Sequence, residues 1–174
     1  PQDPAVHIVD MSENELEVPE DYTKEERRKD ILCYTTEPLA EDVIITGDMT
    51  AELYVSSSAP DTDFVVRVTD VDENGRSIKL ADGVLSARYR SGFERAKFLE
   101  AGEIACLKIR TTKLSNCFRK GHRIRVTVTS GAENFIFPNS NTREGYNSTV
   151  TVVAENTLHH GGIHASKLVV RVEE

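Results

Sequence analysis

The chain contains 174 residues, of which 39% are hydrophobic and 29% are charged. This length suits one domain with a single core, and the hydrophobic fraction is too high for an acidic disordered tail. Acidic residues (29) outnumber Lys and Arg (21), which gives a net charge of −8. The charge argues against nucleic acid and membrane partners, because phosphates and anionic lipids are bound mainly through Lys and Arg. No apolar run is long enough to cross a bilayer.

Residues 1–30 are polar and contain prolines, and residues 24–30 are a run of charges. This composition predicts a solvated connector with at most a short exposed helical turn. The sequence starts at Pro1 without an initiating Met or a signal segment. We therefore expect the chain to be a piece of a longer protein, with the connector leading from an upstream domain.

Three cysteines, Cys33, Cys106 and Cys117, occur without CxxC spacing. Their odd number and spacing favour reduced thiols over a disulfide framework or a zinc knuckle. Reduced thiols in turn favour a cytoplasmic location, although a signal peptide far upstream would not be visible in this sequence.

From Ile31 onwards, hydrophobic and polar residues alternate in short stretches bounded by Gly, Pro, Asn or Asp. Alternation with a period of two predicts strands with one buried face. The residues expected to face the core are, in chain order, Ala51, Leu53 and Val55; Phe64, Val66 and Val68; Ala105, Leu107 and Ile109; Ile124, Val126 and Val128; Val150 and Val152; and Leu168, Val170 and Val172. We expect eight or more strands and no long amphipathic helix.

The pair Asn74-Gly75 separates two of these stretches and predicts a tight type I′ hairpin, in which both central residues have positive φ. Many short antiparallel strands with connections of varying length fit two packed sheets better than a meander. We predict that residues 31–174 form one all-β domain, a jelly-roll β-sandwich of the galactose-binding-like type. Residues 135–147, which are rich in Asn and Gly, are its longest internal loop.

The residues alone predict no catalytic centre. The sequence has no GxSxG elbow, and Ser56-Ser57-Ser58 at the end of a predicted strand is typical of a turn. The run Asp70-x-Asp72-x-Asn74-Gly75 matches the first half of a calcium loop, but Ala81 occupies the twelfth position instead of a bidentate Glu. A plain hairpin is the better interpretation. Asp61-Thr62-Asp63 is a second acidic group, and we expect its carboxylates to accept backbone N–H bonds in a tight loop.

Histidines near the C-terminus are candidate zinc ligands. His160 and His164 would share a helical face, but Gly161 and Gly162 lie between them, and no third ligand is evident. Histidines in a loop before the last strand are the better interpretation, and His122 at the start of a strand is expected to be structural. We therefore predict no metal site, no cofactor and no catalytic residue in this chain.

Three groups of motifs follow one another along the chain. The first comprises Ser56–Phe64 with Asp61-Thr62-Asp63, Asp70-Val71, Asn74-Gly75-Arg76 and the run Asp82-Gly83-Val84-Leu85-Ser86-Ala87-Arg88-Tyr89-Arg90. The second comprises Ser115-Asn116-Cys117-Phe118, Gly121-His122-Arg123-Ile124-Arg125, Phe137-Pro138 and Asn139-x-Asn141-Thr142, and the third is His160-x-x-x-His164-Ala165-Ser166-x-Leu168. In this order they resemble the C-terminal domain of the Xaa-Pro dipeptidyl-peptidase and cocaine-esterase (CocE/NonD) family of hydrolases, over roughly residues 3–172. Ala165 and Arg171 stand where that family usually has Pro.

The resemblance implies an upstream α/β-hydrolase domain in the same polypeptide, which would carry its own catalytic Ser, Asp and His. For this chain it implies an architectural role: packing on the hydrolase domain, helping to shape its active-site cleft and allowing homo-oligomer contacts. The family-motif residues expected to have structural or interdomain roles are Asp61, Thr62, Asp63, Asp70, Gly75, Asp82, Gly83, Arg88, Tyr89, Arg90, Gly121, His122, Arg123, Asn141, His164 and Ser166. Arg88 and Arg90 are expected to point outward from a strand and pair with carboxylates, and local stabilisation is favoured over contact with substrate.

A free-standing carbohydrate-binding module is the alternative function, because some jelly rolls bind sugars through aromatic side chains. The absence of Trp and the aromatic content of 6% argue against a stacking platform. Tyr89, Phe93, Phe135, Phe137 and Tyr146 are the candidate stacking residues, and Phe135 and Phe137 fit core positions equally well. We expect the isolated chain to fold and to hydrolyse no ester.

Overall fold

The computed structural model describes residues 5–6, 20–133 and 135–173. Its elements are β1 (Ala5–Val6), a 3₁₀ turn (Glu25–Arg27), β2 (Leu32–Thr35), β3 (Val43–Gly47), β4 (Thr50–Ser57), β5 (Asp63–Val71), β6 (Ser77–Ser86), a 3₁₀ turn (Ala87–Tyr89), β7 (Ala105–Arg110), β8 (Leu114–Phe118), β9 (Arg123–Thr129), β10 (Ala132–Glu133), a 3₁₀ turn (Gly145–Asn147), β11 (Asn156–His159), a 3₁₀ turn (Gly162–His164) and β12 (Lys167–Val169). The described residues contain no α-helix. The all-β prediction is confirmed.

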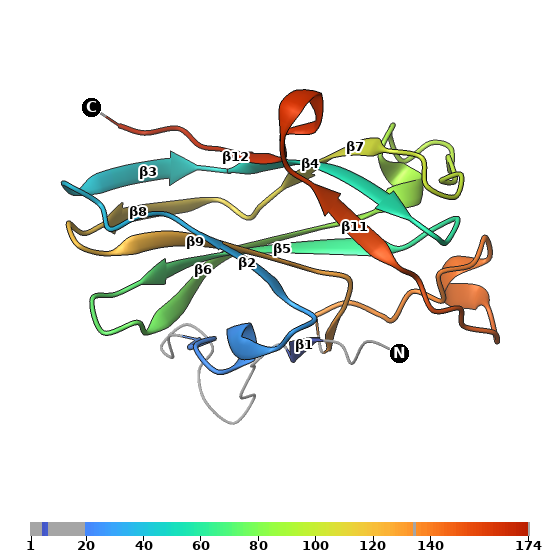
Figure 1. Cartoon of the computed structure of the whole chain (residues 1–174), viewed down its shortest axis with the longest axis horizontal. Coiled ribbons are helices and arrows are strands. Elements are labelled where there is room, and N and C mark those ends of the chain that lie inside the picture. Colours follow the sequence, from blue (N-terminus) through green and yellow to red (C-terminus); the bar gives the residue numbers. More distant parts are fainter. Residues whose placement is uncertain (1–4, 7–19, 134, 174) are drawn as a thin grey trace.

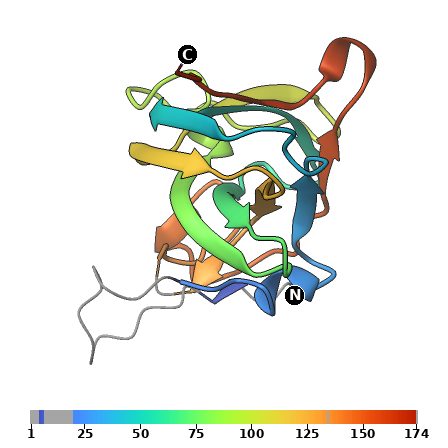
Figure 2. The same cartoon turned by 90° about the vertical axis from the view of Figure 1, so that its left-hand side faces the viewer.

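Two layers of strands pack face to face (Figures 1 and 2). One layer is the antiparallel sheet β2-β9-β5-β6. The other has β4 at its centre, paired with β7 on one edge and with β11 and β12 on the other, and the pair β3-β8 extends it through the segment after β12. This arrangement confirms the predicted β-sandwich.

The core lies between the layers, and alternation in β4 shows why. Ala51, Leu53 and Val55 are buried, whereas Glu52 and Tyr54 lie on the other face and are only partly covered. The inward residues of β4 and β7 meet those of β5 and β9 in one cluster, and a second cluster around Ile45 and Phe118 joins β3 and β8 to β5 and β6.

The strand β5 differs from its prediction because both of its faces are buried. Phe64, Val66 and Val68 face the core as expected. Val65, Arg67 and Thr69 on the opposite face are also buried, with exposed fractions of 1%, 5% and 0%. The expected one-sided pattern is therefore wrong for this strand, which is central in its sheet and covered on its outer face by other chain segments.

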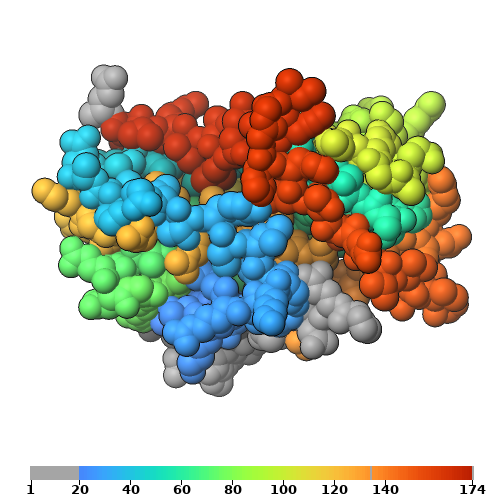
Figure 3. All heavy atoms as spheres, viewed as in Figure 1, coloured from blue at the N-terminus to red at the C-terminus, as the bar shows by residue number. Residues whose placement is uncertain are grey.

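Residues 20–31, here called the strap, run along this outer face (lower part of Figure 3, blue). The strap pairs with β6 through backbone bonds from Tyr22 N to Ser77 O and from Lys79 N to Glu20 O, both 2.9 Å. The Tyr22 ring is 1% exposed and lies 3.7 Å from the guanidinium carbon of Arg67. The strap contains the expected short helical turn; Tyr22 and Ile31 are buried, whereas Lys24, Arg27 and Lys29 are exposed.

The hairpin between β5 and β6 is present, with a different turn from the predicted one. Gly75 N donates to Asp72 O, and Asp72 N donates to Arg76 O, at 2.9 Å each. Gly75 has a φ of +82°, whereas Asn74 is not in the positive-φ region. This is a three-residue loop with a type I turn and a left-handed glycine. The carboxylate of Asp72 stabilises it by accepting the N–H groups of Asn74 and Arg76.

Three further details correct the sequence analysis. Residues 150–153 form no strand, and Val150 and Val152 are 63% and 47% exposed. Arg88 lies in a 3₁₀ turn and Arg90 caps it, so neither points outward from a strand. The last strand is shorter than expected: Leu168 packs against the core, whereas Val172 is 54% exposed.

Candidate functional site

The two carboxylates of Asp61 and Asp63 lie at the end of the sandwich where β5 begins, and neither is exposed to solvent. Asp61 accepts three hydrogen bonds, from the backbone N–H of Arg88 (2.9 Å), from Arg88 Nε (2.7 Å) and from Asn139 Nδ2 (2.8 Å). Asp63 accepts from Asn139 Nδ2 (2.9 Å) and from the Tyr146 hydroxyl (2.8 Å). The expectation that these carboxylates cap backbone N–H groups holds for Asp61, whereas Asp63 accepts the two bonds above from side chains.

These bonds hold the segment after β10 against the end of the sandwich. Asn139 bridges both carboxylates and also accepts the N–H of Asn141, which adopts a φ of 60°. Asn141 Nδ2 then donates to Val152 O at 2.8 Å. A loop without regular strands is thus fixed by side-chain hydrogen bonds, and those to Asp61 and Asp63 satisfy carboxylates removed from water.

Arg88 is the cation of this network. Besides its bonds to Asp61, its terminal nitrogens donate to the backbone oxygens of Thr142 (2.9 Å) and Arg143 (3.1 Å). Gly145 passes so close that a Cβ atom there would lie 2.8 Å from the Arg88 guanidinium, and its φ of +61° favours glycine. The guanidinium therefore joins the Asp61 loop to the turn at Gly145–Asn147.

The pKa of the Tyr146 hydroxyl depends on its contacts within the network. Burial of its hydroxyl, which is the largest cause, and its bond to Asp63 raise the pKa of Tyr146 to about 12, while the contact with Ser86 acts in the opposite direction. A folded pKa above the ordinary value of 10.0 means that this hydroxyl favours the folded state below about pH 10, a contribution lost as the pH rises through about 12.

We expect an alkaline titration, followed by the ultraviolet absorbance of tyrosinate, to contain a step near pH 12 that Tyr146→Phe removes. Asp63→Asn should move this step to lower pH, because the hydroxyl then no longer faces a carboxylate. Loss of a step near pH 10 in Tyr146→Phe would contradict the description of the network.

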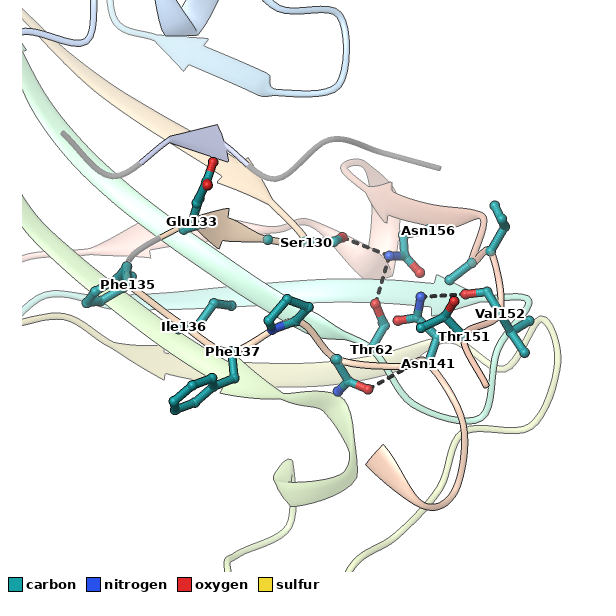
Figure 4. Close-up of a pocket in the computed structure, with 16 residues that line it drawn as sticks. Thr62, Ser130, Glu133, Phe135, Ile136, Phe137, Asn141, Thr151, Val152 and Asn156 are labelled. Carbon is teal, nitrogen blue, oxygen red and sulfur yellow. Dashed lines mark hydrogen bonds between the residues drawn. The ribbon is translucent and has the colours of Figure 1, made fainter. Parts of the chain in front are cut away.

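A hollow of about 880 Å³ opens beside the network, as Figure 4 shows. Its walls are the segments 130–133 and 135–139 with Asn141 on one side and 151–154 with Asn156 on the other, and Thr62 lies at the base. Asn156 joins the two layers there by donating to Thr62 Oγ1 (3.1 Å) and Ser130 Oγ (2.8 Å). Glu133 is the one charged residue among the described residues that line the hollow. The walls therefore offer apolar side chains and neutral amide or hydroxyl groups.

The structure places the other motif residues of β6, β9 and their turns away from this hollow. Asp70 Oδ1 lies 2.9 Å from His122 Nδ1, and Arg67 Nε donates to Asp82 Oδ1 at 2.8 Å in a buried pair. Gly83 packs against β7, where a Cβ atom would lie 2.5 Å from Arg110 O. Two residues complete the group: Gly121 lies against Glu73, and Arg123 donates to Thr36 O at 2.9 Å.

The remaining motif residues stabilise turns. Arg90 donates to the backbone oxygens of Ala87, Lys97 and Phe98 and lies 3.7 Å from Glu103, and the Tyr89 ring packs on Phe93. The predicted pairing of arginines with carboxylates is thus present for Arg88 with Asp61 and for Arg90 with Glu103.

His159 ends β11, and His160 and His164 lie between β11 and β12; the His159 and His164 rings lie 6.4 Å apart, and all three histidines also contact other residues. His159 Nε2 lies 3.0 Å from Ser56 Oγ. The His160 ring contacts Tyr34, and the His164 ring contacts Tyr54. Ser166 Oγ donates to His159 O and accepts the N–H of Tyr54. Within residues 5–6, 20–133 and 135–173, no group of three His, Cys, Asp or Glu side chains is arranged to hold a metal ion. In the same ranges no hydrogen bond joins His159 to a carboxylate, so Ser56 and His159 lack the acid of a catalytic triad.

Comparison with known proteins assigns the chain to a family. Residues 2–169 match the family model of the X-Pro dipeptidyl-peptidase C-terminal non-catalytic domain. The chain belongs to that family. The predicted resemblance to the C-terminal domain of the Xaa-Pro dipeptidyl-peptidase and cocaine-esterase hydrolases is confirmed.

Individual relatives agree with the assignment. The cocaine esterase of Rhodococcus sp. (strain MB1 Bresler) is 42% identical over 150 residues, which cover 83% of this chain and 26% of the esterase. Among solved structures, an aminopeptidase from a marine sediment Thaumarchaeota archaeon superposes with a TM-score of 0.85 at 25% identity, covering 90% of this chain and 28% of the enzyme. An α-amino acid ester hydrolase superposes with a TM-score of 0.84 at 24% identity, covering 89% of this chain and 27% of that chain. This chain therefore spans about a quarter of the length of these relatives.

Membrane spanning by a helix finds no support in the structure. In the part of the chain that is described, no helix is long and apolar enough to cross a bilayer.

The sequence indicates Asp61, Asp63 and Arg88, but not the way in which Asn139, Tyr146 and Asn156 complete the network. Asn139 and Tyr146 lie 76 to 83 positions from the carboxylates that they bind, and Asn156 lies 94 positions from Thr62. Asn139 belongs to the Asn139-x-Asn141 motif, and this motif is the sequence feature that could have identified Asn139 as a member of the network. Nothing in the sequence around Asn156 distinguishes it from an ordinary loop asparagine.

Proposed function

We propose that this chain is the jelly-roll domain of an α/β-hydrolase-type serine hydrolase, that it packs on the catalytic domain upstream of it, and that it helps to shape the active-site cleft. The observation that carries the proposal is the combination of a non-catalytic family match over residues 2–169 with coverage of only 26% of the cocaine esterase. A domain without its own catalytic groups acts through the larger part of the polypeptide.

The structure supports a positioning role by the way in which it builds the end of the sandwich. Two buried carboxylates, an arginine and an asparagine fix a loop that lines an open hollow. A loop fixed in this way loses little conformational entropy when a partner binds, so it suits a permanent contact between domains.

The chemistry of the parent enzyme is inferred from the names of the relatives, which include an esterase, an ester hydrolase and an aminopeptidase. We propose attack of a serine in the upstream domain on an ester or peptide carbonyl, with a histidine that transfers the proton and an acid that orients the histidine. The acyl pocket of that domain sets the choice of substrate. Three unpaired cysteines in this chain support a cytoplasmic setting.

We expect the upstream part of the polypeptide to catalyse hydrolysis and this chain to support its stability and activity. We expect the isolated chain to hydrolyse no ester substrate, and we expect removal of residues 1–174 from the full polypeptide to lower its Tm and its kcat/KM. Ester hydrolysis assays and thermal unfolding of both forms test this. A truncated enzyme with unchanged Tm, kcat and KM, or turnover by the isolated chain that a serine-directed inhibitor abolishes, would contradict the proposal.

A further inference from the structure

Exposed apolar side chains gather at the hollow. Fifteen large hydrophobic residues are exposed in the described part of the chain, and six of them lie between residues 135 and 153. These six, here called the loop-end surface, are Phe135, Phe137, Tyr146, Val150, Val152 and Val153, of which Phe135, Phe137, Val152 and Val153 line the hollow. Phe137 is 83% exposed and lines the hollow together with Val152 and Val153 (Figure 4). Such a concentration of exposed apolar side chains marks an interaction site.

The supporting backbone of this surface is fixed. Asn139, next to the exposed pair Phe137-Pro138, bonds both buried carboxylates. Asn141 Nδ2 holds Val152 O, and Val152 N donates to Ser140 O at 2.9 Å, so the two walls of the hollow are tied together. The apolar side chains are thus presented by a preformed surface.

The broad faces of the sandwich are less suited to such a contact. The strap covers the outer face of β5 and β6. The outer face of β4 carries Glu52 between Lys108 (3.2 Å) and Lys167 (3.1 Å), a solvated group of charges. The other strongly exposed apolar residues, Phe93 (78%) and Ile163 (89%), stand on separate loops.

The path of the chain points to the occupant of the hollow. β1 pairs in parallel with β10, with Ala5 opposite Ala132 and Val6 opposite Glu133. Ala132 and Glu133 belong to the wall of the hollow. Any domain that precedes residue 5 is therefore tethered beside the loop-end surface, where its effective concentration is high.

We infer that the upstream catalytic domain packs on the loop-end surface, and that Phe137 is the central apolar anchor of this contact. This inference rests on the proposed function. The matching element of the catalytic domain is an apolar, largely uncharged segment with neutral hydrogen-bonding groups, because Glu133 is the one charge that the described lining presents. Second copies of this chain and separate proteins are alternatives that the experiments below distinguish.

Hydroxyl-radical footprinting of the full polypeptide tests the inference without altering the protein. Phe137 and Phe93 are the same residue type and are similarly exposed in this chain, at 83% and 78%. We expect Phe137 to be modified several-fold more slowly than Phe93 in the full polypeptide, at a protein concentration where it is monomeric. Fast modification of Phe137 with protection of Phe93 or Ile163 would show that the domains pack through another face, which overturns this inference alone. Fast modification of all three residues would overturn the packing proposal itself. Protection of Phe137 that appears only as copies associate would assign the surface to a second copy.

A matched pair of variants measures the energetic contribution of the surface. In the full polypeptide we expect Phe137→Asp to lower the Tm by several degrees, because a carboxylate would be desolvated between the domains. Phe93→Asp, equally exposed in this chain, should leave the Tm nearly unchanged. Equal effects of the two substitutions would contradict the assignment of Phe137 as the anchor.

Discussion

Replacing Asp61 with alanine is expected to lower the free energy of unfolding by about 3–5 kcal/mol, the usual result of removing one partner from a buried ion pair. The Asp61 carboxylate is fully buried and accepts three hydrogen bonds. Its removal leaves the Arg88 side chain, only 12% exposed, without its counter-charge. Urea denaturation of the chain measures the loss.

Asp48→Ala is the matched control for this prediction. Asp48 also pairs with an arginine Nε at 2.8 Å, but its partner Arg110 is 70% exposed. Exposed pairs contribute about 0–1 kcal/mol, so this variant should unfold almost as the wild type does. Similar losses for the two substitutions would show that Asp61 is not the anchor of a buried network.

The second large effect concerns the buried pair of Arg67 and Asp82 under the strap. We expect Asp82→Ala to cost about 3–5 kcal/mol, since both side chains are about 5–6% exposed and the Arg67 guanidinium, which lies over the Tyr22 ring, would lose its carboxylate. Lys79, 3.1 Å from Asp82, would lose a partner as well.

The double variant Arg67→Met with Asp82→Leu separates the loss of pairing from the loss of packing. Apolar residues of similar volume often replace a buried pair without net cost, so most of the lost stability should return. Urea midpoints of the single and double variants provide the comparison. A double variant as unstable as Asp82→Ala would show that the hydrogen-bonding groups themselves are required.

The sequence predicted the fold because strand alternation is local. The residues Ala51, Leu53 and Val55 of β4 alternate with partly covered neighbours, and the strand forms where the pattern indicates. The same pattern in β5 predicted one buried face, but the second face is covered by the strap, which is more than thirty positions away in the chain. Local patterns carry no information about such distant coverage.

The site was predictable only in part for the same reason. The short acidic group Asp61-Thr62-Asp63 indicated a fixed loop, and the carboxylates do fix one. Their partners Asn139 and Tyr146 lie 76 to 83 positions further along the chain. The type of the Asn74-Gly75 turn was also set by context, because the Asp72 carboxylate favours a type I turn by accepting two N–H groups.

The network and the proposed function are linked through the loop that both involve. Residues 139–147 connect the buried carboxylates to the loop-end surface, so we expect a substitution at Asp61 to alter the position of the loop at the hollow.

The most direct test of the central claim is an immunoblot of source-cell lysate with an antibody against this chain, beside the same lysate labelled with a fluorophosphonate probe for reactive serines. We expect the antibody to detect a polypeptide much larger than the 19.4 kDa of this chain, and we expect the probe to label the same band. A band near 19.4 kDa without label would contradict the account and make glycan binding the next function to test.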